Sequence, residues 1–194
     1  MPLPALGASD SEALRDGWLG QPANTLSSVA YVVAGAWTDT LDLKGAGVNE
    51  SMSPSAEGRR AVLLRDLANI RMEMDGVDRL GLTALGGADA FTVNHLTGTD
   101  FRRADVDLSA PTGGGDAQTD TVTVNGTPRR DRIDVETEGA RVDVGGLRTE
   151  VRISGSGIID RLQINGLDGD GDFDVDDDVS VLLAAAVDLG SGQR

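Results

Sequence analysis

Residues 120–136 read DTVTVNGTPRRDRIDVE, and residues 160–176 read DRLQINGLDGDGDFDVD. A third segment of the same pattern, DRLGLTALGGADAFTVN, occupies residues 78–94, and the three align without a gap at offsets of 42 and 40 residues. Each module begins with Asp, continues with two apolar residues two positions apart, passes through a small polar turn and ends with a second apolar pair. An alternation of period two is typical of a strand with one buried face. Each module therefore predicts a strand, a turn and a second strand.

The recurrence near 40 residues predicts a stack of modules, because a unit of two short strands cannot bury an apolar face alone. The spacer repeats as well, since RADV at 103–106 matches RVDV at 141–144. Asn125 and Asn165 recur at one place in the module, as a ladder of stacked side-chain amides requires. These features favour an all-β fold, a right-handed parallel β-helix or β-roll-like solenoid. A sandwich of antiparallel hairpins is the competing fold, since the same alternation would serve it.

Composition indicates a narrow, acidic β protein. The chain has 26 glycines but only two Trp, one Tyr and three Phe. Its formal charge is −15, from 32 acidic and 17 basic side chains, which argues against nucleic-acid or anionic-membrane binding because both require basic patches. Without cysteine, neither a disulfide nor a thiolate metal site can form. The sequence begins without the features of a cleaved signal peptide, and its longest apolar run, 29–37, is shorter than the ~20 residues of a bilayer span.

The sequence divides into three parts. Residues 1–42 predict a short N-terminal cap, helical or irregular, in which 9–15 resemble a capped helix and 26–37 form a helix or a strand. Residues 43–178 contain the short β-type runs and form the predicted solenoid. Residues 179–194 are predicted to be a C-terminal tail.

The turn of the third module carries the densest acidic cluster, with seven aspartates between positions 168 and 178. Like charges this close are unfavourable in a folded turn unless a cation offsets them. Calcium suits them, because it takes roughly six to eight oxygen ligands from carboxylates and backbone carbonyls. The candidate calcium ligands in this turn are Asp168, Asp170, Asp172, Asp174 and Asp177.

Residues 85–94, LGGADAFTVN, together with 96–100, 120–126 and 160–169, resemble the secreted hemolysin-type, or RTX-like, calcium-binding proteins of bacteria. In that family the nonapeptide G-G-x-G-x-D-x-U-x builds a parallel β-roll with calcium between successive turns. The resemblance covers residues 43–175. It implies that Asp89 and Asp131 are further calcium ligands, and that the protein is extracellular or lies at the cell surface.

The third turn also has the spacing of an EF-hand or dockerin loop. Asp168, Asp170, Gly171, Phe173 and Asp177 match positions of such a loop. On this alternative, residues 179–187 form the exiting helix.

Catalysis has little support in the sequence. His95 is the single histidine, so no two-histidine metal site can form, and we expect it to be a surface turn residue. We therefore expect a calcium-binding, non-catalytic module whose folding is stabilised by extracellular calcium. The alternatives are a calcium-independent structural or adhesive solenoid, with a cell-surface or matrix partner on its lateral face, and a carbohydrate-active β-helix enzyme.

Overall fold

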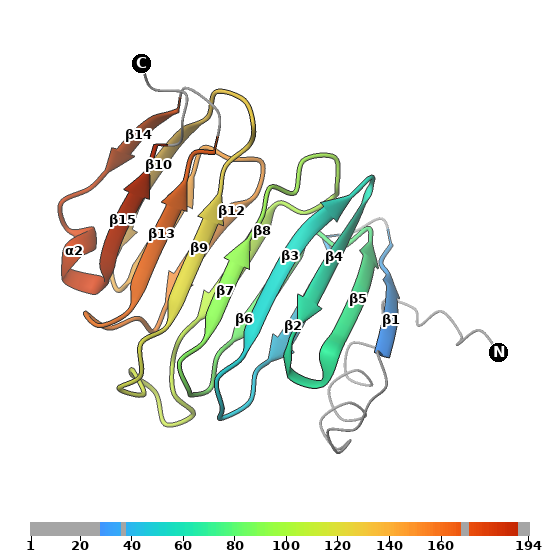
Figure 1. Cartoon of the computed structure of the whole chain (residues 1–194), viewed down its shortest axis with the longest axis horizontal. Helices are drawn as coiled ribbons and strands as arrows, with labels where there is room; N and C mark the ends of the chain where they lie inside the picture. Colours follow the sequence, from blue (N-terminus) through green and yellow to red (C-terminus); the bar gives the residue numbers. More distant parts are fainter. Residues whose placement is uncertain (1–27, 36–37, 168–170, 190–194) are drawn as a thin grey trace.

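A computed structural model describes residues 28–35, 38–167 and 171–189 of the chain. These residues are mostly β, and their strands form two mixed sheets that face each other (Figure 1). The first sheet contains, in spatial order, β1 (Ser28–Val33), β5 (Ile70–Asp75), β4 (Arg60–Arg65), β3 (Ser51–Glu57), β7 (Ala90–Val93), β9 (Thr121–Asn125), β13 (Arg161–Asn165) and β15 (Ala184–Asp188). The second contains β14 (Asp172–Val175), β10 (Arg132–Glu138), β11 (Arg141–Gly145), β12 (Glu150–Ser154), β8 (Arg103–Asp107), β6 (Arg79–Thr83) and β2 (Thr40–Lys44). The expectation of an all-β fold is confirmed at this level.

A single apolar core lies between the two sheets. Every second residue of a central strand points into it, as in β9, where Val122 and Val124 are buried and Thr121 and Thr123 are only partly so. Strands of both sheets contribute to the same cluster of buried side chains. The described helical elements are short and lie outside the sheets: η1 (Leu67–Asn69), a 3-10 turn, and α2 (Val179–Leu182). Among the described residues, no helix has the length and apolar character that crossing a membrane would need.

The second and third modules stack in parallel, in register, at an offset of 40 residues. Their first strands, β9 and β13, pair so that Val122 lies beside Leu162. Their second strands, β10 and β14, pair so that Ile133 lies beside Phe173. The predicted register of these two modules is therefore confirmed strand by strand.

The predicted place of the first module is wrong. Its first strand, β6, lies in the second sheet, where Leu80 pairs with Leu41 and Ala104 instead of joining Val122. Its second strand, β7, places Phe91 beside Val122. The cause is the number of strands between modules. Only one strand, β8, lies between the first and second modules, and the chain crosses to the other sheet at each step from β6 to β9. The second module therefore begins in the first sheet, with β9, whereas the first module begins in the second sheet, with β6.

Two antiparallel meanders interrupt the parallel order, β3–β4–β5 in the first sheet and β10–β11–β12 in the second. The second meander also contradicts the expectation that residues 103–106 and 141–144 occupy equivalent places in the fold. Residues 103–106 belong to β8, which pairs in parallel with β12, whereas residues 141–144 belong to β11, which runs antiparallel to β12. Each meander begins with a two-residue hairpin turn whose first residue is a glycine at positive φ, Gly58 and Gly139.

The sheets extend beyond the predicted solenoid region of 43–178. Strands β1 and β2 begin within the predicted cap, and the strand alternative for 26–37 holds for the residues of β1. The expected helix at 9–15 lies outside the described residues. The predicted EF-hand exit helix at 179–187 is wrong: α2 ends after one turn, Leu183 is extended, and β15 then pairs with β13.

Candidate functional site

Four acidic residues form a column at one end of the first sheet. Glu50, Asp89, Asp120 and Asp160 immediately precede β3, β7, β9 and β13. Asp89 Oδ1 accepts a hydrogen bond from the backbone N–H of Glu50 (2.9 Å), Asp120 Oδ1 from that of Asp89 (2.8 Å), and Asp160 Oδ1 from that of Asp120 (2.9 Å). We call this column the carboxylate ladder. It joins neighbouring strands through side chains, in addition to the backbone bonds of the sheet.

The carboxylate ladder is buried, with its four residues only 1–3% exposed. Burial raises the pKa of Asp89 to about 7, and the neighbouring Asp120, Glu50 and Asp116 carboxylates add to the rise. Burial likewise raises the pKa of Asp120 to about 6, with Asp160 and Asp116 contributing. The hydrogen bonds donated by backbone N–H groups act against both rises, because they favour the charged form. Asp89 Oδ2 is buried without a hydrogen-bond partner among the described residues.

Glu50 anchors the first rung through its own carboxylate. Its Oε2 forms an ion pair with Arg65 of β4, and its Oε1 accepts a hydrogen bond from the backbone N–H of Ala46 (2.6 Å). Gly45 lies against this carboxylate so closely that a Cβ on residue 45 would collide with Glu50 Oε1 and the backbone of Ala84. The first rung therefore combines a charge pair with a tight backbone turn.

A second ladder, of side-chain amides, runs at the other end of the same strands. Asn125 Nδ2 donates to Asn94 Oδ1 (2.9 Å), and Asn165 Nδ2 donates to Asn125 Oδ1 (2.8 Å). Asn94 Nδ2 in turn donates to the carbonyl of Pro54 (3.2 Å). The predicted stacking of Asn125 on Asn165 is confirmed, and Asn94 adds a rung that the sequence alignment at constant offset did not place there.

The predicted calcium ligands that the structure describes lie in three separate places. Asp89 belongs to the carboxylate ladder. Asp131 closes the turn after β9, where its carboxylate accepts hydrogen bonds from the backbone N–H (2.6 Å) and the hydroxyl (2.8 Å) of Thr127. Asp172 and Asp174 lie on the exposed face of β14, and Asp177 is exposed in the turn before α2. Asp168 and Asp170 lie outside the described residues. Within residues 28–35, 38–167 and 171–189, no three acidic or histidine side chains gather closely enough to hold a metal ion.

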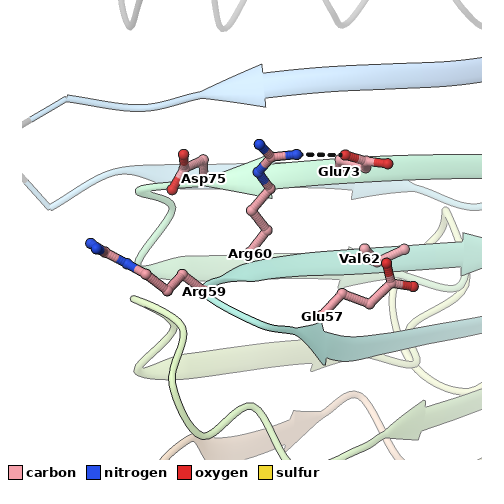
Figure 2. Close-up of a pocket in the computed structure, with 6 residues that line it drawn as sticks. All are labelled: Glu57, Arg59, Arg60, Val62, Glu73 and Asp75. Carbon is pink, nitrogen blue, oxygen red and sulfur yellow. Dashed lines mark hydrogen bonds and ion pairs between the residues drawn. The ribbon is translucent and has the colours of Figure 1, made fainter.

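A hollow lined by described residues lies over the meander of β3, β4 and β5 and has a volume of about 600 Å³. Figure 2 shows Arg60 reaching across from β4 to Glu73 on β5, with which it forms an ion pair of 3.2 Å. Glu57 lies on the neighbouring strand and pairs with Arg71 (2.7 Å). The hollow is an open, salt-bridged surface depression, and its lining carries neither a histidine nor a hydroxyl nucleophile.

His95 is exposed in the turn after β7, as expected of a surface residue. The ladder residues Glu50, Asp120 and Asp160 are not among the site residues that the sequence predicts. One signal marks them, because each ladder acid directly precedes an alternating apolar run. Comparison of the chain with protein-family models, with curated proteins and with solved structures gave no match.

Proposed function

We propose that this chain is a non-catalytic structural β module, built as an interrupted solenoid and held together by internal polar ladders instead of bound calcium. The solenoid interpretation is supported by the parallel, in-register pairing of the second and third modules. The antiparallel meanders are then insertions within its coils. The observation that carries the proposal is the carboxylate ladder, which is buried and occupied by backbone donors along its length.

The ladder performs the role that calcium was expected to have. In a calcium-stabilised roll, carboxylates at the strand ends are bridged by the ion. Here, the Asp89, Asp120 and Asp160 carboxylates are bridged by the backbone N–H groups of the preceding rungs. An intramolecular hydrogen bond contributes roughly 0.5–1.5 kcal/mol, and leaving a buried N–H without an acceptor would cost roughly 1–3 kcal/mol. The calcium-independent structural alternative is therefore favoured over calcium-dependent folding.

Far-UV circular dichroism tests this proposal directly. Protein purified in chelator should show a full β spectrum and a cooperative thermal transition, and added calcium should leave the spectrum unchanged. A disordered spectrum in chelator that converts to β with calcium would contradict it. Assays of sugar release from acidic polysaccharides should be negative, which tests the alternative of a carbohydrate-active enzyme.

Calcium binding at the acidic end of the chain is the second candidate function. Asp172, Asp174 and Asp176–Asp178 are all exposed, so a cation would offset their mutual repulsion without entering the core. Calorimetric calcium titration should lose its heat in Asp172→Ala/Asp174→Ala, while Asp131→Asn, in the turn after β9, keeps it. Under this proposal calcium adds local order and is not required for folding.

The outer face of the first sheet is the proposed lateral face for a cell-surface or matrix partner. Over β7, β9 and β13 its outward residues are mostly uncharged, with Thr92 beside Thr123 and Thr123 beside Gln163, and Arg161 beside Thr121 is the one charged side chain there. The outer face of the second sheet is instead charged, as in the ion pair of Arg103 with Asp105 (3.3 Å). This contrast singles out the mostly uncharged face as the surface for an uncharged partner. An extracellular or cell-surface location is part of the same proposal and rests on the resemblance to secreted calcium-binding proteins.

A further inference from the structure

The apolar core ends at β14, β15 and α2, at the left of Figure 1. In β13 the inward-facing Leu162 and Ile164 are fully buried. Their register partners on β15, Ala185 and Val187, are exposed and half-buried respectively. On β14 the inward-facing residues are also only half-buried, whereas Val179 of α2 and the following Leu183 are fully buried in the core. The two sheets therefore end with core-facing side chains on β14 and β15 that α2 covers only in part and that no further strand covers within the described residues.

β15 is the last strand of the first sheet at this end. The Ala184 N–H donates to the Asp160 carbonyl (2.9 Å), and the Asp188 carbonyl accepts from the Gly166 N–H (2.7 Å). Successive residues of a strand direct their backbone groups to opposite sides. The N–H and C=O groups of Ala185 and Val187 must then point away from β13. None of the described strands pairs with this edge.

Acidic side chains lie on the elements that form this end. Asp172 and Asp174 lie on β14, and Asp176–Asp178 lie in the turn that leads to α2, all of them exposed. Arg132, on β10, is the register neighbour of Asp172. A second copy of the chain would present the same acidic groups and be repelled. A cationic partner would be attracted, and its charges would determine its orientation and its association rate.

We propose that this end binds an extended, cationic segment of another protein, in which apolar and Lys or Arg residues alternate, by adding it as a strand to β15. Its apolar side chains would cover Ala185 and Val187, and its basic side chains would face the acidic turn. Strand addition of this kind takes its affinity from main-chain hydrogen bonds and its specificity from alternate side chains. The proposal specifies a partner class for the structural module proposed above, and rests on that function only in assuming a fold that forms without calcium.

Fluorescence anisotropy with a labelled peptide of alternating lysine and valine tests the proposal, in chelator and at about 0.05 and 0.5 M NaCl. A peptide of the same composition, with its lysines and valines in two blocks, is the control. The alternating peptide should bind the wild type more tightly than the block peptide, and more weakly at the higher salt concentration. Equal binding of the two peptides would mean attraction to net charge alone and would overturn the proposal.

Two variants locate the site. Ala185→Pro removes an N–H that points away from β13, a position at which an edge strand tolerates proline, and should weaken binding about tenfold. Asp177→Asn/Asp178→Asn should reduce both the affinity and its salt dependence, and the Asp178 side chain makes no cap hydrogen bond whose loss would complicate the result. Asp42→Asn/Asp100→Asn removes the same charge from exposed positions away from this end, Asp42 being on β2 at the opposite end of the second sheet, and should leave the affinity unchanged.

Circular dichroism of each variant separates failure of the partner proposal from failure of the fold. A folded Ala185→Pro protein that binds as tightly as the wild type would overturn strand addition at β15. Equal weakening by the Asp177/Asp178 and Asp42/Asp100 variants would overturn the acidic end as the site. Wild-type self-association that Ala185→Pro abolishes would identify a second copy as the occupant and would also overturn the proposal. Loss of β signal in chelator would instead contradict the proposed function itself.

Discussion

The carboxylate ladder predicts that the protein loses stability as the pH rises from about 4 to about 8. Asp89 and Asp120 have folded pKa values of about 7 and about 6, above the ~3.9 expected of an unfolded aspartate. Between these values the folded state binds more protons than the unfolded state. The stability that the two carboxyl groups contribute is thus fully present below about pH 4, and it is lost as the pH rises through their folded pKa values.

The magnitude follows from the same values. A folded pKa of about 7 against an unfolded value of ~3.9 corresponds to roughly 4 kcal/mol for Asp89, and the smaller difference at Asp120 to roughly 3 kcal/mol. The two groups are neighbours and titrate together, so their effects are not simply additive. We expect the free energy of unfolding to fall by about 3–6 kcal/mol between pH 4 and pH 8. Glu57, whose pKa is lowered by a hydrogen bond from Arg71, acts in the opposite direction at the exposed surface.

Urea unfolding, followed by circular dichroism at several pH values, measures this dependence. Asp89→Asn keeps an oxygen that can accept the Glu50 N–H and removes the buried charge. It should raise stability at pH 8 by about 1–3 kcal/mol, since the buried amide offsets part of the gain, and should flatten the profile between pH 4 and pH 7. Asp100→Asn, at an exposed position, should leave the profile unchanged. A wild-type stability that is flat or rises over this range, with the same slope in Asp89→Asn, would refute the reasoning.

Three further predictions concern the contacts that hold the stack. Asn125→Ala removes the central rung of the amide ladder and should lower the free energy of unfolding by about 1–3 kcal/mol in urea titrations; no change would mean that the ladder contributes nothing. Gly146→Ala should destabilise more than Gly139→Ala in the same assay, because both glycines have positive φ but only residue 146 has its Cβ position filled, by the Arg132 carbonyl; equal effects would contradict this packing. Arg65→Met leaves the buried Glu50 carboxylate without its cation and should lower the melting temperature by an amount equivalent to ~3–5 kcal/mol, and a near-neutral result would refute the role of the pair.

The strand content and the contact between the second and third modules could be predicted from the sequence, because they depend on local patterns. The alternation of Val122 and Val124 fixes which face is buried, and the recurrence of Asn125 and Asn165 fixes the register. The position of the first module could not be predicted in this way. Leu80 and Phe91 both begin alternating pairs, so a period of two does not tell which of them faces Val122.

The meanders and the carboxylate ladder could not be predicted from the alternation of apolar residues alone. Gly58 and Gly139 each follow a glutamate and lie two residues before a strand that begins with arginine. This pattern indicates a two-residue hairpin turn, which the solenoid prediction did not include. The burial of Asp120 depends on the strands around it and cannot be inferred from the charge of the residue. An aspartate before an alternating run has the same sequence appearance whether it binds calcium or accepts a backbone N–H.

Native-state hydrogen exchange in chelator tests the central claim most directly, because it reports on the individual amides that the ladder binds. The backbone N–H groups of Asp89 and Asp120 should exchange as slowly as those of the buried strands, and added calcium should not change their rates. Rapid exchange of these two amides in chelator, slowed by calcium, would contradict a fold held together by its own carboxylates.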